Sequence, residues 1–187
     1  MVPFCSRICD GRFPFAERLI ELPANLPPQR HAIHGFAWQR PWVVEARSER
    51  AVALEHSHAA DAWPWDYLAR QEFSLDDDRL CVALSVRNMA ATPMPVGFGL
   101  HPYFSRTPGA RIQAGVAGRW EMDAEVLPVR RSGLPPEQNL PRGITAAEQV
   151  LDNIYTNWDG QFSVRWPEWA AALTVSAAKV FGHLVVY

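Results

Sequence analysis

The sequence has almost no charge imbalance and no long apolar run, and each absence excludes a class of protein. Its 187 residues carry 18 basic and 20 acidic side chains, for a formal net charge of -2 and a pI near 6.3. Proteins that bind nucleic acid or anionic membranes usually show a clear basic excess, so neither partner is predicted. No stretch reaches the ~18 uninterrupted apolar residues that a transmembrane helix needs. We therefore expect a globular protein whose partner is a small molecule.

Cysteine is scarce, and the pattern of a secretory leader is missing. Cys5, Cys9 and Cys81 are an odd number without the spacing of a disulfide framework. The first residues do not combine a basic region with a following apolar run. Together these features predict a cytoplasmic protein in a reducing compartment.

The hydrophobic pattern has period two over most of the chain, which is typical of half-buried strands. In FSLDDDRLCVALSVRN, apolar residues alternate from Leu80 to Val86 after an Asp-rich turn. Further strands or hairpins are predicted at 42–47 with 51–56, within 110–129, at 161–166 with 171–176, and at 183–187. Only 145–150 has a brief helical pattern, and 131–143 reads as a Pro-rich surface loop. We predict one all-β domain over 1–187, an antiparallel sandwich or barrel.

The segment PVGFGLHPYF, residues 95–104, contains the most informative histidine. Pro102 forces His101 into extended backbone and ends strand pairing, because proline has no N–H. Gly97 and Gly99 allow a ligand or a second backbone to come close, and Tyr103 and Phe104 offer aromatic walls. Imidazole titrates near neutrality and suits acid–base chemistry, although a purely structural histidine is the alternative.

The segment HAIHGFAWQRPW, residues 31–42, places a polar group beside flat aromatic rings. His34 precedes Gly35, and Trp38 or Trp42 could provide a face for the apolar side of a sugar ring. The alternative is that these tryptophans belong to the core, which we expect of at least one of them.

A metal site is the alternative reading of several histidines and cysteines. The pairs available as ligands are His31 with His34, Cys5 with Cys9, and His56 with His58. His56 and His58 share one strand face, as in metal-binding barrels of the cupin type, but the expected glutamate and glycine are missing. Cys5 and Cys9 lack a second cysteine pair at zinc-ribbon spacing. We predict no metal, and a cupin-like enzyme stays an alternative.

Four blocks in this order, VPFCSRICDGRF, HAIHGFAWQRPW, PVGFGLHPYF and LDNIYTNWDG, resemble the aldose 1-epimerase (galactose mutarotase) family, and most closely its bacterial galactose mutarotase-like branch. The resemblance covers residues 2–187. It implies a large antiparallel β-sandwich, the galactose mutarotase-like supersandwich. It also implies an isomerase of carbohydrate metabolism that interconverts the α and β anomers of a free glucose- or galactose-type aldose without a cofactor.

The resemblance also implies roles for individual residues. His101 matches the general acid of the family, and His34 matches its second substrate-contacting histidine. Arg7 matches the arginine that holds sugar hydroxyls, and Asp152 matches the aspartate that accepts hydrogen bonds from them. Trp38 and Tyr103 are further candidate substrate-binding residues.

Two departures from the family pattern bear on activity. Ser6 stands where the family usually has asparagine before the arginine. The glutamate base of the family follows the segment matching HLVVY, where this sequence ends, and the first strands of the family precede VPF. We therefore expect a chain truncated at both ends, with activity weak or lost, since such a group contributes typically 10²- to 10⁴-fold. A non-catalytic carbohydrate-binding remnant is the alternative, and exposed strand edges predict self-association.

Overall fold

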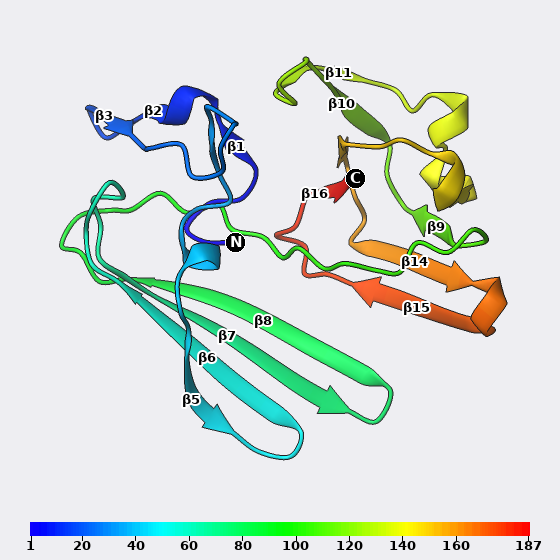
Figure 1. Ribbon diagram of the computed structural model, residues 1–187, viewed down its shortest axis with the longest axis horizontal. Helices are drawn as coiled ribbons and strands as arrows, with labels where there is room; N and C mark the ends of the chain where they lie inside the picture. The colour runs from blue at the N-terminus through cyan, green and yellow to red at the C-terminus, as the bar shows by residue number, and fades with distance from the viewer. The chain divides into compact units, whose positions relative to one another are not determined.

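The computed structural model describes all residues, 1–187, and divides them into two compact units (Figure 1). Unit 1 is Met1–His101 and unit 2 is Pro102–Tyr187, and each is described by itself. Both units consist of short antiparallel strands joined by loops and three-residue 3-10 turns. None of these turns is long and apolar enough to cross a membrane. One sandwich domain over 1–187 stays a prediction.

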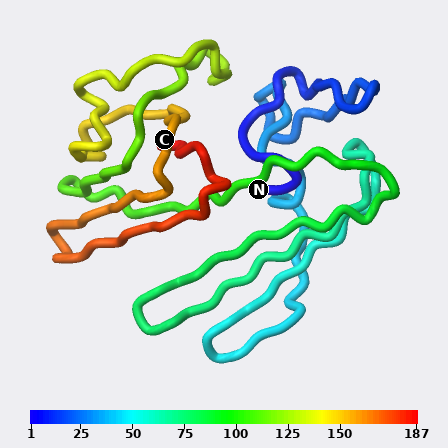
Figure 2. The backbone as a smooth tube through the Cα atoms, turned by 180° about the vertical axis from the view of Figure 1, so that it is seen from behind, coloured from blue at the N-terminus to red at the C-terminus, as the bar shows by residue number.

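Unit 1 contains a two-stranded ladder, a small hairpin and a four-stranded sheet. The ladder pairs β1 (Arg7–Ile8) with β4 (Ala32–Ile33), and the hairpin pairs β2 (Arg12–Phe15) with β3 (Arg18–Glu21). The sheet has the order β5 (Val43–Arg47), β6 (Ala51–His58), β7 (Tyr67–Asp76) and β8 (Arg79–Asn88). Two 3-10 turns, η1 (Cys9–Gly11) and η2 (Ala37–Gln39), complete the unit. The long hairpins of the sheet project from the rest of unit 1 (Figure 2).

The two faces of the four-stranded sheet differ in chemistry because the side chains alternate along each strand. On the polar face, Arg70 bonds to carboxylates of all three neighbouring glutamates, Glu45, Glu55 and Glu72. On the other face, the aligned residues Val52, Phe73 and Val82 form an apolar row across the sheet.

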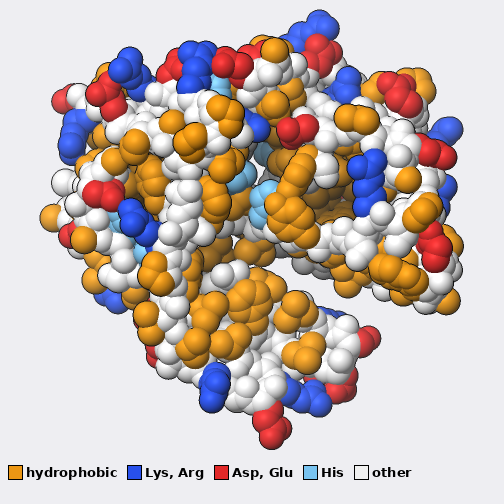
Figure 3. All heavy atoms as spheres, viewed as in Figure 1, with side chains coloured by type: hydrophobic (Ala, Val, Ile, Leu, Met, Phe, Trp, Pro, Cys, Tyr) orange, Lys and Arg blue, Asp and Glu red, His pale blue; other side chains and the backbone are white.

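The apolar row continues to the tips of the hairpins, where its neighbours are open to solvent. Leu80 is 60% exposed and lies opposite Leu75, which is 50% exposed. Figure 3 shows hydrophobic side chains gathered over these hairpins. Within this chain the far half of the sheet thus has an incompletely covered apolar face.

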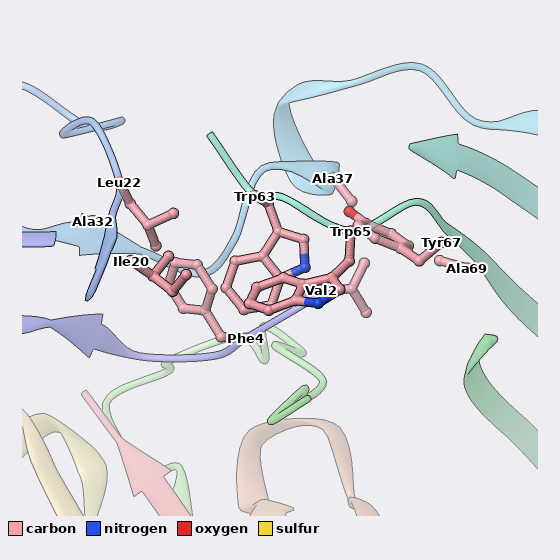
Figure 4. Close-up of a cluster of buried hydrophobic side chains, with 10 residues drawn as sticks. All are labelled: Val2, Phe4, Ile20, Leu22, Ala32, Ala37, Trp63, Trp65, Tyr67 and Ala69. Atoms are coloured by element: carbon pink, nitrogen blue, oxygen red, sulfur yellow. The ribbon is translucent and has the colours of Figure 1, made fainter. Parts of the chain in front are cut away.

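The core of unit 1 gathers around Trp63 and Trp65, in the loop between β6 and β7, and around Tyr67, the first residue of β7 (Figure 4). Trp63 and Tyr67 are 2% and 1% exposed, and Trp63 packs against Trp65 with ring centroids 5.2 Å apart. Phe4 stacks at a tilt on Trp63 at 5.8 Å, so the N-terminal segment is anchored in this core.

The N-terminal segment also runs beside the glycines that precede His101. The Cys5 N–H donates to the Gly97 carbonyl at 2.7 Å, and the Gly97 N–H donates to the Pro3 carbonyl at 3.0 Å. Met1 and Gly99 exchange a second pair of bonds. The close approach needs a glycine at Gly99, where an added Cβ would lie 3.3 Å from the side chain of Cys5, whereas one added at Gly97 would meet nothing within 4 Å.

Unit 2 contains two four-stranded sheets. The first has the order β11 (Pro128–Ser132), β10 (Gly118–Met122), β13 (Asn153–Thr156) and β16 (His183–Val186). The second has the order β12 (Ile144–Thr145), β9 (Arg111–Ala114), β14 (Gln161–Trp166) and β15 (Ala171–Ser176). Four 3-10 turns join them: η3 (Pro136–Gln138), η4 (Leu140–Arg142), η5 (Ala146–Glu148) and η6 (Pro167–Trp169).

The two sheets of unit 2 share a core, so this unit is a small sandwich. Tyr155 of β13 is fully buried and clusters with Ala114 of β9 and Ile144 of β12. Leu184 and Val186 of β16 pack against the same cluster.

The structure confirms most of the strands predicted from alternation and corrects two other predictions. The hairpin of β14 and β15 has the predicted bounds, 161–166 and 171–176. The predicted surface loop 131–143 is partly buried. Leu140, the first residue of η4, is only 1% exposed and belongs to the hydrophobic core of unit 2. The predicted helix at 145–150 is only the single 3-10 turn η5 after the short strand β12.

Candidate active site

His34 is held by its own backbone and by Ser6. The Ser6 N–H donates to Nδ1 of His34 at 3.1 Å, and the His34 N–H donates to the Ser6 carbonyl at 3.0 Å. This pair lies next to the ladder in which Arg7 faces Ile33. Both residues adopt left-handed backbone, with φ of 62° at Ser6 and 61° at His34. The reciprocal bonds thus fix the direction of the imidazole ring.

The environment of His34 keeps its ring neutral at physiological pH. Burial lowers its pKa from 6.5 to about 4, and the positive charges of His101, the N-terminus and Arg7 act in the same direction. Since Nδ1 accepts a hydrogen bond, the single proton of the neutral ring lies on Nε2. His34 therefore presents an Nε2–H donor toward the site.

His101 lies edge-on to His34, with ring centroids 5.5 Å apart and an angle of 89° between the ring planes. Its backbone follows directly after the glycines that pair with Met1 and Pro3. A Cβ built on Gly97 meets nothing within 4 Å, so that glycine borders open space. The two histidines that the sequence singles out are thus brought together within unit 1.

Arg7 lies on β1 beside this pair. Its Nε donates to Oε1 of Gln29 at 3.2 Å, and the side chain is half-buried. Its charge reaches His34, where it contributes to the lowered pKa. One edge of the guanidinium is thereby fixed, which orients the planar group.

The two tryptophans of 31–42 have different environments, as expected from the sequence. Trp42 donates from Nε1 to the Ala37 carbonyl at 2.9 Å and packs on His56 next to the core. Trp38 donates to the Gly35 carbonyl at 3.0 Å and is 45% exposed. Trp38 therefore combines a fixed ring with an accessible surface close in sequence to His34.

The remaining candidates, Tyr103 and Asp152, belong to unit 2, because the boundary between the units follows His101. Asp152 is exposed and directly precedes β13. Tyr103 is 78% exposed and contacts Tyr187 edge-to-face, with centroids 6.1 Å apart. Phe104 is not an exposed wall: it packs against Phe162 in a hydrophobic cluster.

Of the residues weighed as metal ligands, His56 and His58 have other partners. His56 and His58 are buried, and their ring nitrogens lie 3.3 and 3.1 Å from the carbonyls of Pro41 and Trp63. They act as core residues of unit 1.

One group of three residues could bring ligand atoms together: Cys9, Asp10 and His31, whose ligand atoms lie within 4.8 Å of one another. However, the carboxylate of Asp10 pairs with Arg30 at 2.8 Å. The Asp10 N–H also donates to Nδ1 of His31 at 3.0 Å. These atoms therefore serve the turn η1, and we assign no metal to them.

The fold defines a class of protein, the galactose mutarotase-like β-sandwich. The chain matches a galactose mutarotase-like protein from Clostridium acetobutylicum with a TM-score of 0.81 at 16% identity, over 97% of this chain and 62% of that one. It also matches a crystal structure from Escherichia coli K12 that is provisionally described as an aldose 1-epimerase. The TM-score is 0.86 at 31% identity, and the match covers 92% of this chain and 59% of that one.

The aldose 1-epimerase family model matches residues 1–187, and this chain belongs to that family. Among curated proteins it is 31% identical to the uncharacterized protein YphB of Escherichia coli (strain K12) over 169 residues, which are 90% of this chain and 58% of YphB. The uncharacterized protein YihR of the same organism is 25% identical over 107 residues, 56% of this chain and 35% of YihR. The chain thus spans less than two thirds of the length of these relatives.

Sequence reasoning missed two features of the candidate site. In the sequence, Ser6 stands out only as a departure from the family pattern, whereas in the structure its backbone holds His34 through two hydrogen bonds. Tyr187 is only the end of a predicted strand, whereas in the structure its ring contacts Tyr103. Neither has a local signal, because both contacts join residues far apart in sequence.

Proposed function

We propose that this chain acts on a free hexose of the glucose or galactose type and interconverts its α and β anomers, as an aldose 1-epimerase. The observation that carries the proposal is the pair His34–His101, with ring centroids at 5.5 Å and His34 held as a neutral Nε2–H donor. Two adjacent imidazoles, one of them held as a neutral donor, are suited to acid–base work on one small substrate.

In the proposed reaction, protonated His101 gives its proton to the ring oxygen of the sugar as the bond from that oxygen to the anomeric carbon breaks. A base removes the proton of the anomeric hydroxyl, which forms the open-chain aldehyde. Rotation about the adjacent carbon–carbon bond presents the other face of the carbonyl group. Ring closure then returns both protons, so the reaction has no net redox change and needs no cofactor.

The other candidates would bind rather than react. Arg7, oriented by Gln29, would donate to sugar hydroxyls, and the exposed Asp152 would accept from them. The accessible ring of Trp38 would pack against the apolar face of the pyranose, and Tyr103 would contribute a further hydroxyl. The near-neutral charge of the chain is consistent with an uncharged aldose.

The test is anomer exchange of glucose and galactose followed by NMR, with His101→Ala as the variant. The proposal predicts acceleration over buffer that His101→Ala lowers by about 10²- to 10⁴-fold. Weak activity of the 187-residue chain itself stays a prediction, and the same measurement gives its rate of anomer exchange. Saturable sugar binding without any acceleration would instead support the carbohydrate-binding remnant. If neither binding nor acceleration is detected, only the assignment of fold and family stands.

A further inference from the structure

The strand register of unit 2 brings the last residue of the sequence next to Asp152. In the antiparallel ladder of β13 and β16, Asn153 lies opposite Val186. Asp152 directly precedes β13 and Tyr187 directly follows β16, so the two residues lie next to each other just beyond the end of this ladder. The charge of Asp152 acts on the Tyr187 phenol, as expected of close neighbours. Figure 1 shows β16 as the red strand at the C-terminal end of unit 2.

The alternation along β16 directs Tyr187 away from the core of the unit. Leu184 and Val186 pack against the cluster around Tyr155, so Val185 and Tyr187 point to the opposite face. Their exposures agree, at 51% for Val185 and 62% for Tyr187. The phenol ring therefore lies on the accessible side of the sheet.

Tyr187 and Tyr103 form a pair of accessible phenols. Their rings meet edge-to-face at 6.1 Å and an angle of 83°. A hydrogen bond to Tyr103 and the nearby charge of Asp152 raise the pKa of Tyr187 to about 12. Large aromatic side chains at this exposure contribute little to a core, but they are suited to ligand contact.

We propose that Tyr187 is a substrate-binding residue, and that Tyr187, Tyr103 and Asp152 together form a polar aromatic subsite for the hydroxyl groups of a pyranose. The inference rests on the proposed function and adds a residue to it. The carboxylate accepts from sugar hydroxyls, the phenols both donate and accept, and an aromatic face covers C–H groups of the ring. This combination recognises a neutral polyol better than a phosphate, which needs cations.

The test uses the 187-residue chain with ¹³Cζ-labelled tyrosine, whose four signals from Tyr67, Tyr103, Tyr155 and Tyr187 are assigned with single Phe variants. Galactose or glucose should shift the signals of Tyr103 and Tyr187 and leave those of the buried Tyr67 and Tyr155 in place. Tyr187→Phe should weaken sugar affinity by about three- to tenfold, as expected for one hydrogen bond.

Tyr155→Phe is the matched control, because it removes the same hydroxyl group from a fully buried ring on the neighbouring strand. Unchanged affinity in Tyr187→Phe, or shifts of all four tyrosine signals together, would overturn the inference. If the wild-type chain still accelerates anomer exchange in a His101-dependent way, the proposed function survives that result. A wild-type chain that neither binds sugar nor accelerates exchange overturns both.

Discussion

Ser6 and His34 hold each other through two reciprocal hydrogen bonds, one from the Ser6 N–H to the imidazole and one from the His34 N–H to the Ser6 carbonyl. Both residues have positive φ, a conformation that non-glycine residues rarely adopt. The chain thus maintains unfavourable local backbone where a candidate functional ring must be oriented, and the surrounding ladder and core offset this cost.

Backbone strain at Ser6 predicts an unusual response to substitution. Ser6→Val should lower the free energy of unfolding by about 1–2 kcal/mol, because a β-branched residue at φ of 62° crowds its own backbone. Ser6→Asn should be neutral or stabilising, since asparagine tolerates this conformation. Ser57→Val in the extended strand β6 is the matched control and should not destabilise. Urea unfolding measures all three, and equal losses for both valine variants would contradict the prediction.

Gly35 and Gly97 predict opposite outcomes for the same substitution. Gly35 has φ of 67°, and a Cβ there would overlap the Val2 carbonyl, so Gly35→Ala should cost about 2–4 kcal/mol of unfolding free energy. Gly97→Ala should have almost no effect on stability, because its Cβ would enter open space. Thermal and urea unfolding of the two variants test this contrast. A large loss in Gly97→Ala, or none in Gly35→Ala, would show that the N-terminal segment packs differently.

The lowered pKa of His34 predicts a pH dependence of stability. The unfolded residue has a pKa near 6.5 and the folded residue a pKa of about 4, so between these values the unfolded chain binds more protons. The contribution of His34 to stability is therefore complete above pH 6.5 and declines as the pH falls to 4. His34→Gln should flatten this part of the profile, whereas His183→Gln on the exposed end of β16 serves as the control. Parallel profiles for wild type and His34→Gln would refute it.

The apolar face of the β5–β8 sheet predicts self-association of the 187-residue chain. Leu75 and Leu80 are exposed near the hairpin tips, and β5 and β8 are both edge strands. Leu80→Lys should shift the elution volume in size exclusion toward the monomer, while Leu19→Lys on the small hairpin should not. A sharp monomer peak of the wild-type chain with a cooperative melt above roughly 60 °C would contradict the prediction.

Many strands could be predicted from the sequence because their signals are local. Alternation alone gives the bounds of β14 and β15 and the apolar face of β8. Glycine stereochemistry indicates that a second backbone can approach this segment closely, and the structure places the N-terminal residues against Gly99. These properties depend on a few neighbouring residues, so no knowledge of the tertiary structure is needed.

Only the tertiary structure decided which distant residues meet and which apolar residues are buried. The Ser6–His34 bonds, the pairing of His34 with His101 and the neighbourhood of Asp152 and Tyr187 depend on strand register across long sequence separations. Leu140, surrounded by prolines, looks like part of a loop, but it is buried because unit 2 has space for it between its sheets. Local periodicity determines how a strand presents its two faces, whereas the free energy of packing determines what each face contacts.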